Sequence, residues 1–371
     1  MTMASARRRA PWCRPLLALG LAAALLGAWA TQSAATVLPV AAKALSAEGK
    51  PGGKTGDKAS GKAADSRLVR IALIADLPQW PDAEAPTQQL LDNLAQRRLA
   101  FVIHAGGIKG DTESCADAML AGRLRLLDQS PLPLVYIPGE TDWAECEQAV
   151  NGSFDPDERL ARLRELAFPD DDSLGQRKLR LIRQSDQAKF RSYRENVRWT
   201  AGKVLLVGMN VPDDNNHYRT EAGRNGEFED RREANRQWLA RAFSAAEQES
   251  LDGIVLVIHG DPQFGNGWEK RGKPTLLDGF LRHRQRDGYL EFKRQLRELV
   301  SDYRGQVLLI HSSIGGFGID TPLRDAKGKT IRSFTRVALP VGSPKQWTEL
   351  TISPDSRSLF SVALQDGAGK N

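Results

Sequence analysis

Cysteine is scarce in this sequence, with three residues among 371. Cys13 precedes the first apolar run, so it is not placed as a lipid-acceptor cysteine, which would follow that run. The other two are Cys115 and Cys146. A pair of cysteines does not by itself make a structural zinc site, because such sites use four ligands. The two cysteines alone therefore do not indicate a structural zinc site.

A long hydrophobic run is also lacking. The first apolar run, Leu16–Ala30, has 15 residues, whereas a membrane-spanning helix needs about 20. Arginines precede the run and small residues follow it, which is the order of a secretory signal cleaved near Ala30 or Ala35. An uncleaved anchor is the alternative. Either way, we expect an exported protein of the periplasm or cell envelope.

Net charge is nearly absent from the main part of the chain. The sequence carries +6 overall, but residues 1–36 contribute four arginines and no acid, and residues 37–66 contribute five lysines against three acids. Residues 67–371 are therefore close to neutral and lack the basic balance of a nucleic-acid-binding domain. We expect no nucleic acid partner, and membrane contact only through the N-terminal signal or anchor.

Composition divides the chain into three parts. Residues 1–36 are the predicted signal or anchor, residues 37–66 an Ala/Gly/Lys-rich flexible linker without apolar periodicity, and residues 67–371 a folded domain. In an exported chain, an even pair of cysteines favours one disulfide, between Cys115 and Cys146. Two free buried thiols are the alternative.

From Arg67 onward, apolar runs alternate with helical patterns. We predict strands over residues 68–75, 100–104, 132–137, 203–209, 253–258 and 306–310, and helices over 87–98, 116–127, 155–166, 229–248 and 289–303. This alternation is typical of βαβ units with a largely parallel core sheet. The runs at 335–339, 346–352 and 358–364 alternate apolar and polar residues, which favours antiparallel strands.

Polar or glycine residues follow five of the predicted strands. They are Asp76, Gly106-Gly107, Gly139-Glu140-Thr141-Asp142, His259 and His311. Active sites of α/β proteins lie at the carboxyl ends of the strands. If the strands share one sheet, these residues converge on one edge, as the ligands of a metal cluster must.

These motifs resemble those of the calcineurin-like metallophosphoesterases. Active members carry Asp-x-His, Gly-Asp-x-x-x-Gly, Gly-Asn-His-Asp/Glu, a lone His and Gly-His-x-His at successive strand ends. More closely, the chain looks like an exported bacterial subgroup with a Gly-Asp-Asn-Glu-Trp third motif, over residues 67–371 and including "ENVRW" and "ANRQWL". The resemblance implies an α/β sandwich of two mixed β-sheets flanked by helices, and phosphate-ester hydrolysis by two metals.

At several positions where the family has metal ligands, this chain has other residue types. "IALIADLPQW" keeps Asp76 but has Pro78 in the histidine slot. "FVIHAGGIKG" keeps Gly106 but has Gly107 in the slot of the aspartate that bridges the metals. "LLIHSSIGG" lacks both histidines of the last motif, unless His311 has shifted into the first of them.

The third and fourth motifs are better preserved. In "PGETDW", Glu140, Thr141 and Asp142 stand where the subgroup has Asp, Asn and Glu, and "VIHGDP" has His259 in the lone-histidine slot. The candidate ligands are therefore Asp76, Glu140, Asp142, His259 and His311. They are too few for two metals, which leaves one divalent ion (Mn, Fe, Zn, Mg or Ca) or none.

Each candidate ligand also has a plainer interpretation. Asp76 can cap the following turn, and Glu140 and Asp142 can be solvated turn residues. His259 can hydrogen-bond to a backbone carbonyl, and His311 can be structural. These alternatives stay open on the sequence alone.

The leading functional prediction is a degenerate exported phosphoesterase, inactive or weakly active with at most one metal, that binds a small phosphorylated or other anionic ligand. The first alternative is an active metal-dependent phosphoric ester hydrolase with a carboxylate-rich site. The second is a non-catalytic binding module of the cell envelope. Whether the chain is an enzyme is left open by the sequence.

Overall fold

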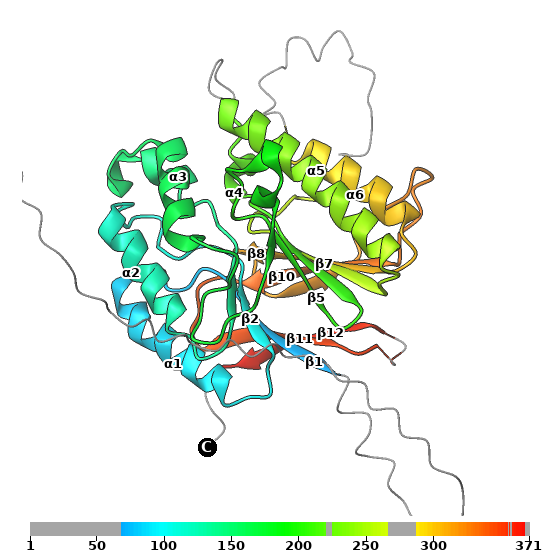
Figure 1. The fold of residues 1–371 in the computed structure, drawn as a ribbon, viewed down its shortest axis with the longest axis horizontal. Helices are drawn as coiled ribbons and strands as arrows, with labels where there is room; N and C mark the ends of the chain where they lie inside the picture. The colour runs from blue at the N-terminus through cyan, green and yellow to red at the C-terminus, as the bar shows by residue number, and fades with distance from the viewer. Residues whose placement is uncertain (1–67, 220–224, 266–286, 355, 357, 368–371) are drawn as a thin grey trace, which may run out of the picture. The chain divides into compact units, whose positions relative to one another are not determined.

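A computed structural model describes residues 68–219, 225–265, 287–354, 356 and 358–367 (Figure 1). Contacts within the chain divide it after Lys58, and every described residue belongs to the second unit. The predicted signal (1–36) and linker (37–66) lie outside the described residues, so both stay predictions. No helix in the described ranges combines the length and the apolar character needed to cross a bilayer.

The described strands form two mixed β-sheets, as predicted (Figure 1). The five-stranded sheet has the order β12-β11-β1-β2-β3. Its strands are β1 Val69–Ile74, β2 Phe101–His104, β3 Leu134–Tyr136, β11 Gln346–Ile352 and β12 Phe360–Asp366. Strands β1, β2 and β3 are parallel, and β11 runs antiparallel to both β1 and β12.

The second sheet has seven strands in the order β4-β5-β6-β7-β8-β10-β9. They are β4 Ile182–Arg183, β5 Val197–Ala201, β6 Val204–Gly208, β7 Gly253–Val257, β8 Gln306–Ser313, β9 Gly318–Asp320 and β10 Phe334–Pro340. Strands β6, β7, β8 and β10 are parallel. The prediction of an antiparallel strand over residues 335–339 is therefore wrong for its pairing with β8, although β10 does pair antiparallel with β9.

Helices cover the outer face of each sheet (Figure 1). The helices α1 Glu84–Ala95, α2 Asp117–Asp128 and α3 Pro156–Ala167 pack on the five-stranded sheet, and α5 Gly226–Gln248 and α6 Leu290–Asp302 pack on the seven-stranded sheet. The short α4 spans Asp213–Asn216, and single 3-10 turns span Pro81–Ala83, Ala144–Glu147, Ala149–Asn151, Gln184–Asp186 and Ala188–Phe190. The predicted sandwich flanked by helices is confirmed.

Local sequence explains where the third helix begins. The Asp155 side chain accepts a hydrogen bond from the Glu158 backbone N–H at 3.0 Å, and Pro156 occupies the first turn. Such a cap satisfies a backbone donor that has no partner inside the helix, and proline suits the first helical position because its fixed φ is already helical. The helix therefore starts next to the predicted residue.

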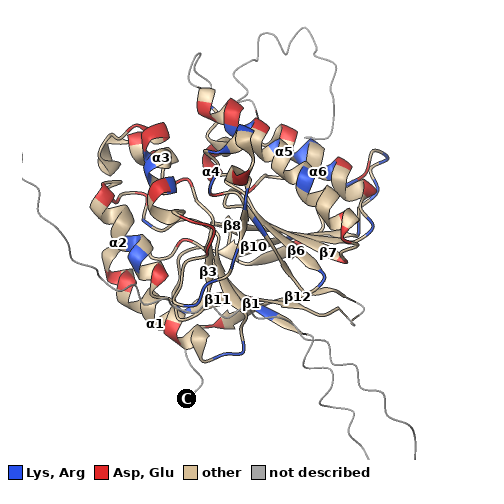
Figure 2. Cartoon of the chain, in the orientation of Figure 1, with Lys and Arg blue, Asp and Glu red and all other residues tan. Residues whose placement is uncertain are grey.

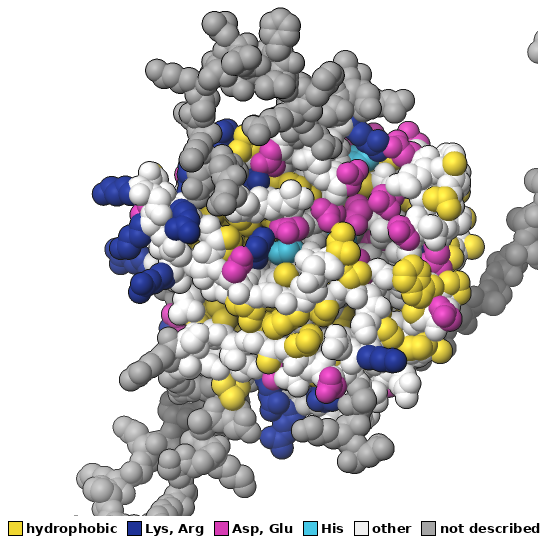
Figure 3. Space-filling view, turned by 180° about the vertical axis from the view of Figure 1, so that it is seen from behind, with side chains coloured by type: hydrophobic (Ala, Val, Ile, Leu, Met, Phe, Trp, Pro, Cys, Tyr) yellow, Lys and Arg dark blue, Asp and Glu magenta, His cyan; other side chains and the backbone are white. Residues whose placement is uncertain are grey.

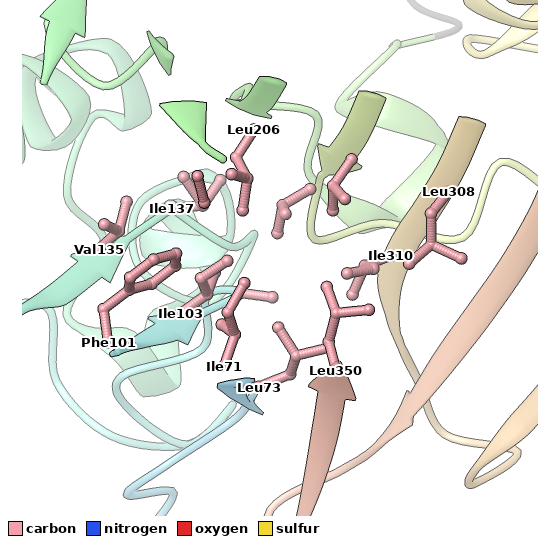
Figure 4. Packing of buried hydrophobic residues seen from close by; sticks show 14 of the residues in the cluster. Ile71, Leu73, Phe101, Ile103, Val135, Ile137, Leu206, Leu308, Ile310 and Leu350 are labelled. Carbon is pink, nitrogen blue, oxygen red and sulfur yellow. The ribbon is translucent and has the colours of Figure 1, made fainter. Parts of the chain in front are cut away.

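An apolar core between the sheets holds them face to face (Figure 4). Ile71 and Leu73 of β1 and Ile103 of β2 meet Leu308 and Ile310 of β8, and all five side chains are essentially fully buried. Burial of each such side chain is worth about 1.5–3 kcal/mol. This packing fixes the distance between the strand ends of the two sheets, where the candidate site lies.

Candidate functional site

Three of the five candidate residues meet at the strand ends. His259 Nε2 lies 2.5 Å from Glu140 Oε2 and 3.8 Å from Asp76 Oδ1. Asp76 follows β1 and Glu140 follows β3, whereas His259 follows β7 of the other sheet. The strands that carry these residues do not share one sheet, and their ends converge across the sandwich of two sheets.

The hydrogen bonds of His259 define its charge. Its Nδ1 lies 2.6 Å from the Ala105 carbonyl oxygen, and a carbonyl can only accept, so Nδ1 carries a proton. Its Nε2 faces the Glu140 carboxylate and donates as well. Burial alone would lower the pKa of His259, but the carboxylates of Glu140 and Asp76 hold that pKa well above its usual range. The ring is therefore an imidazolium.

The two carboxyl groups beside this ring differ in protonation. Burial raises the pKa of Asp76 to about 7, against the opposing influence of His259 and of a hydrogen bond from Ser312 Oγ. Burial would also raise the pKa of Glu140, but the His259 imidazolium brings it below the usual value. At mildly acidic pH the cluster thus holds one cation, one anion and one neutral acid.

Asp142 is turned into its own loop. Its Oδ2 accepts hydrogen bonds from the Gly139 N–H at 2.7 Å, the Gly107 N–H at 3.1 Å and the Tyr136 hydroxyl at 2.6 Å. Its Oδ1 accepts from the Ile108 N–H at 2.7 Å. The side chain is fully buried. The carboxylate therefore ties the loop after β2 to the loop after β3, and it is neither solvated nor open to a ligand.

Glycines line the cluster so closely that no side chain fits in their place. A Cβ on Gly107 would lie 2.2 Å from Asp76 Oδ1, and one on Gly106 would lie 2.6 Å from His259 Nδ1. A Cβ on Gly139 would lie 2.8 Å from His259 Cε1. Gly106 and Gly107 also have φ of 90° and 76°, in the left-handed region that favours glycine. The backbone therefore fills the space beside Asp76 and His259.

His311 belongs to a different group of residues. It lies inside β8, which runs to Ser313 and not to the predicted end at Ile310. Its Nδ1 is 2.6 Å from the Ser312 carbonyl oxygen, and its Nε2 is 3.9 Å from Asp261 Oδ1, an oxygen that Arg336 Nη1 also approaches at 3.1 Å. Burial lowers the pKa of His311. Among the described residues, the His311 side chain has no hydrogen bond or ion pair with Asp76, Glu140 or His259.

The five candidates do not make a metal site as they are arranged. Within the described part of the chain, no group of three or more His, Cys, Asp or Glu side chains could hold a metal ion. A metal-binding imidazole must offer an unprotonated nitrogen, whereas both nitrogens of His259 are donors. Asp142 is occupied by loop donors. The residues present therefore do not fit the metal that the resemblance implies.

Further acidic residues surround the cluster. Burial raises the pKa of Glu145 to about 7 and also raises that of Asp213, and in both cases the negative charge of Glu140 adds to the effect. The buried Lys109 is the nearby cation, and its Nζ donates to the Gly110 carbonyl oxygen at 2.9 Å. Figure 2 shows acidic residues on α4 and on the loop after β3, and acidic side chains gather on one face in Figure 3. The site has a surplus of negative charge.

Sequence reasoning missed Ser312, which hydrogen-bonds to Asp76. Neighbouring residues on a strand point to opposite faces, so His311 and Ser312 could not both point to the cluster. That alternation was the available signal. Because β8 extends past Ile310 to Ser313, this alternation places Ser312, and not His311, on the side of Asp76. The packing role of Gly106, Gly107 and Gly139 leaves no such signal in a single sequence.

The two cysteines form the predicted disulfide. Cys115 and Cys146 are bonded, with Cα atoms 5.6 Å apart and a separation of 31 residues in sequence. Cys115 precedes α2, and Cys146 lies in the 3-10 turn Ala144–Glu147 that follows the Gly139–Asp142 loop. The bond therefore fastens the segments that continue from the loops tied by Asp142.

The pKa shifts predict that the protein becomes less stable as pH rises from about 5 to 8. Asp76 and Glu145 titrate near 7 in the fold against ordinary values of 3.8 and 4.5, so the native state keeps protons that the unfolded chain releases. His259 adds stability that is fully present below 6.5 and is lost as pH rises through its raised native pKa. Glu140 sets the lower limit, because its contribution is lost as pH falls through its lowered pKa.

Urea unfolding at a series of pH values measures this effect, with Asp76→Asn as the matched variant. We expect the wild-type midpoint to be highest near pH 5 and the variant to show a flatter slope between pH 5 and 8. A wild-type protein that is more stable at pH 8 than at pH 5 would contradict the assigned protonation states.

Comparisons with known proteins give a likeness of fold. No family model matches the chain, and no curated protein matches it in sequence. Among solved structures, the chain is similar to GAP50, the anchor in the inner membrane complex of Plasmodium, with 12% identity, a TM-score of 0.46, and coverage of 81% of this chain and 85% of that one.

Two enzymes are also among the similar structures. The purple acid phosphatase PPD1 from yellow lupin (Lupinus luteus) seeds has 9% identity and a TM-score of 0.43, over 82% of this chain and 52% of that one. The 5'-nucleotidase from Candida albicans has 9% identity and a TM-score of 0.42, over 81% of this chain and 51% of that one. This chain thus spans about half of each enzyme, and at these TM-scores the likeness assigns it no activity, metal or partner.

Proposed function

We propose that this chain is an exported, catalytically degenerate protein of the calcineurin-like phosphoesterase type that acts by binding and not by hydrolysis. The observation that carries the proposal is the position of Gly107. The slot of the bridging carboxylate lies against Asp76, where even a Cβ would come within 2.2 Å of Asp76 Oδ1. In the family that the chain resembles, a shared carboxylate at this position joins the two ions. A side chain here would require Asp76 to move.

The charge of His259 supports the same proposal. Its two N–H groups are committed to Ala105 and Glu140, so the strongest remaining imidazole ligand has no free lone pair. The alternative of an active hydrolase with a carboxylate-rich site would need Asp76, Glu140 and Asp142 to face one ion. Asp142 instead accepts four hydrogen bonds from neighbouring loops and Tyr136. The geometry therefore argues against the active-hydrolase alternative.

The ligand class is a separate question. The predicted phosphorylated or anionic ligand would approach Glu140, Glu145 and Asp213. Burial raises the pKa of Glu145 and of Asp213, and the negative charge of Glu140 adds to both shifts. Like charges oppose binding of an anion at this position. The charge of the cluster therefore opposes binding of an anionic ligand there, and a thermal-shift titration with inorganic phosphate tests such binding directly.

Export to the periplasm or cell envelope enters the proposal from the sequence of residues 1–36. The disulfide between Cys115 and Cys146 is compatible with it, because disulfides persist in oxidising compartments such as the periplasm. Whether the signal is cleaved near Ala30 or Ala35, or kept as an anchor, is decided by N-terminal sequencing of the exported protein.

A combined metal and activity measurement tests the proposal. We expect the exported protein to contain well under one equivalent of Mn, Fe, Zn, Mg or Ca by mass spectrometry, and to hydrolyse an aryl phosphate no faster than a blank with added Mn²⁺. The matched variants are Asp76→Ala, at the cluster, and Asp92→Ala, an exposed carboxylate on α1. Two metals per chain, with turnover lost in Asp76→Ala but kept in Asp92→Ala, would refute the proposal.

A further inference from the structure

We infer that His259 acts as a built-in cation that joins the strand ends of the two sheets where a metal ion would otherwise join them. This inference rests on the proposed metal-free site, and it gives that site a structural purpose. The cluster would then be a clamp between the sheets, assembled entirely from the chain's own residues.

The bonds of the clamp run from one sheet to the other. His259 follows β7 of the seven-stranded sheet, and its ring contacts Ala105, directly after β2, and Glu140, after β3. Ser312 of β8 donates to Asp76, which follows β1. The Ser312 N–H also donates to the His259 carbonyl oxygen at 2.9 Å. Each strand end of the parallel part of the five-stranded sheet is therefore bound to β7 or β8.

The cation is needed because Glu140 is largely buried. Its side chain is 17% exposed, and that of His259 is 3% exposed. A buried carboxylate without a partner is strongly destabilising, whereas a well hydrogen-bonded opposite charge offsets that cost. The imidazolium provides the charge and two directed donors together. A metal ion would have to displace a proton from the same ring, so the clamp and a metal at His259 exclude each other.

Two glycines beside the His259 ring are also part of the clamp. Gly106 and Gly139 approach His259 so closely that a Cβ on either would lie within 2.8 Å of a ring atom. This close approach brings the Ala105 carbonyl within 2.6 Å of Nδ1. The glycine backbone therefore packs directly against the Nδ1 and Cε1 side of the imidazolium ring.

A double-mutant cycle on the exported chain tests the clamp. The variants are His259→Gln, Glu140→Gln and the double variant, each unfolded in urea with EDTA present. We expect each single variant to lower the folded-to-unfolded ratio by about 100-fold or more, and the double variant to lose far less than the product of the two. The control cycle uses Arg236 and Glu233, a surface pair on α5 at 2.8 Å, whose coupling should stay within about fivefold.

Nitrogen NMR of the wild-type protein supplies a readout that needs no variant. We expect both ring nitrogens of His259 to carry protons at pH 7, and EDTA or added Zn²⁺ to leave the ring signals and the urea midpoint unchanged. A ring with one unprotonated nitrogen, or a coupling in the cycle no larger than that of the control pair, would overturn the clamp.

The two proposals fail in different ways. A metal-free, inactive protein with a neutral His259 ring contradicts the clamp alone. Stoichiometric metal with phosphatase turnover contradicts the proposed function, and the clamp falls with it. If His259→Gln does not fold, the nitrogen spectrum of the wild-type protein still decides the protonation state on which the clamp depends.

Discussion

Replacing Gly107 by alanine is expected to lower the free energy of unfolding by about 2–5 kcal/mol. The new Cβ would lie 2.2 Å from Asp76 Oδ1 and 2.9 Å from the Asp76 Cα. Asp76 cannot easily move away, because its carboxyl is bonded to Ser312 and its backbone N–H donates to the Gly106 carbonyl oxygen at 2.7 Å. Urea unfolding monitored by tryptophan fluorescence measures the loss.

A second glycine separates the clash from backbone strain. Gly202 has a φ of 61°, and a Cβ there would meet no atom within 4 Å. Gly202→Ala should therefore show only the left-handed backbone penalty, about 1–2 kcal/mol. Gly122→Ala, inside α2 with only Arg125 Nη2 at 3.8 Å, should be neutral or stabilising by up to about 1 kcal/mol. Equal losses at Gly107 and Gly202 would show that the space beside Asp76 is open.

A second substitution at Gly107 tests whether restoring one missing ligand also restores metal binding. Gly107→Asp restores the residue type of the bridging ligand, yet we expect it to destabilise the fold at least as much as alanine and to bind no Mn²⁺. Asp76 would have to move before the new carboxylate could enter. A Gly107→Asp protein of wild-type stability that binds Mn²⁺ would mean that the loss of metal is a single-residue event.

The strands and helices could be predicted from local sequence patterns. The arrangement of the candidate site could not, because it depends on contacts between segments that are distant in sequence. The apolar run ending at Asp76 and the helix capped by Asp155 follow rules that act within a few residues, so they are found where expected. The extension of β8 to Ser313 depends on its pairing with β10, a contact between strands that a single sequence does not contain. The placement of His311 inside a strand follows from that pairing.

The candidate ligands show why residue type alone is insufficient. Glu140 and Asp142 are two residues apart in one turn, and both are carboxylates. Glu140 turns to His259, whereas Asp142 turns to the N–H groups of Gly107, Ile108 and Gly139. The difference arises from the direction of the chain after β3, which the loop after β2 helps to set. Sequence could therefore predict that the two carboxylates lie near the strand ends, and it could not predict their different roles.

Loss of the Asp142 side chain is expected to destabilise the fold strongly. Asp142→Ala removes the acceptor of three backbone N–H groups and of the Tyr136 hydroxyl, all buried. An unsatisfied buried donor costs about 1–3 kcal/mol, so the expected loss is about 4 kcal/mol or more, and the variant is expected to unfold well below the wild-type urea midpoint. The measurement is made with EDTA present, because Asp142 is expected to stabilise the two loops through its hydrogen bonds and without a metal ion.

Glu145 provides the matched control three residues further on. It is another partly buried carboxylate of the same segment, but burial, together with the repulsion of Glu140, raises its pKa, and its Oε2 has no hydrogen-bond partner among the described residues. Glu145→Ala should therefore change the free energy of unfolding by no more than about 0.5 kcal/mol, or increase it. If EDTA lowers the wild-type stability to that of Asp142→Ala, then Asp142 acts through a metal, and its role as the hydrogen-bonded anchor of the two loops is wrong.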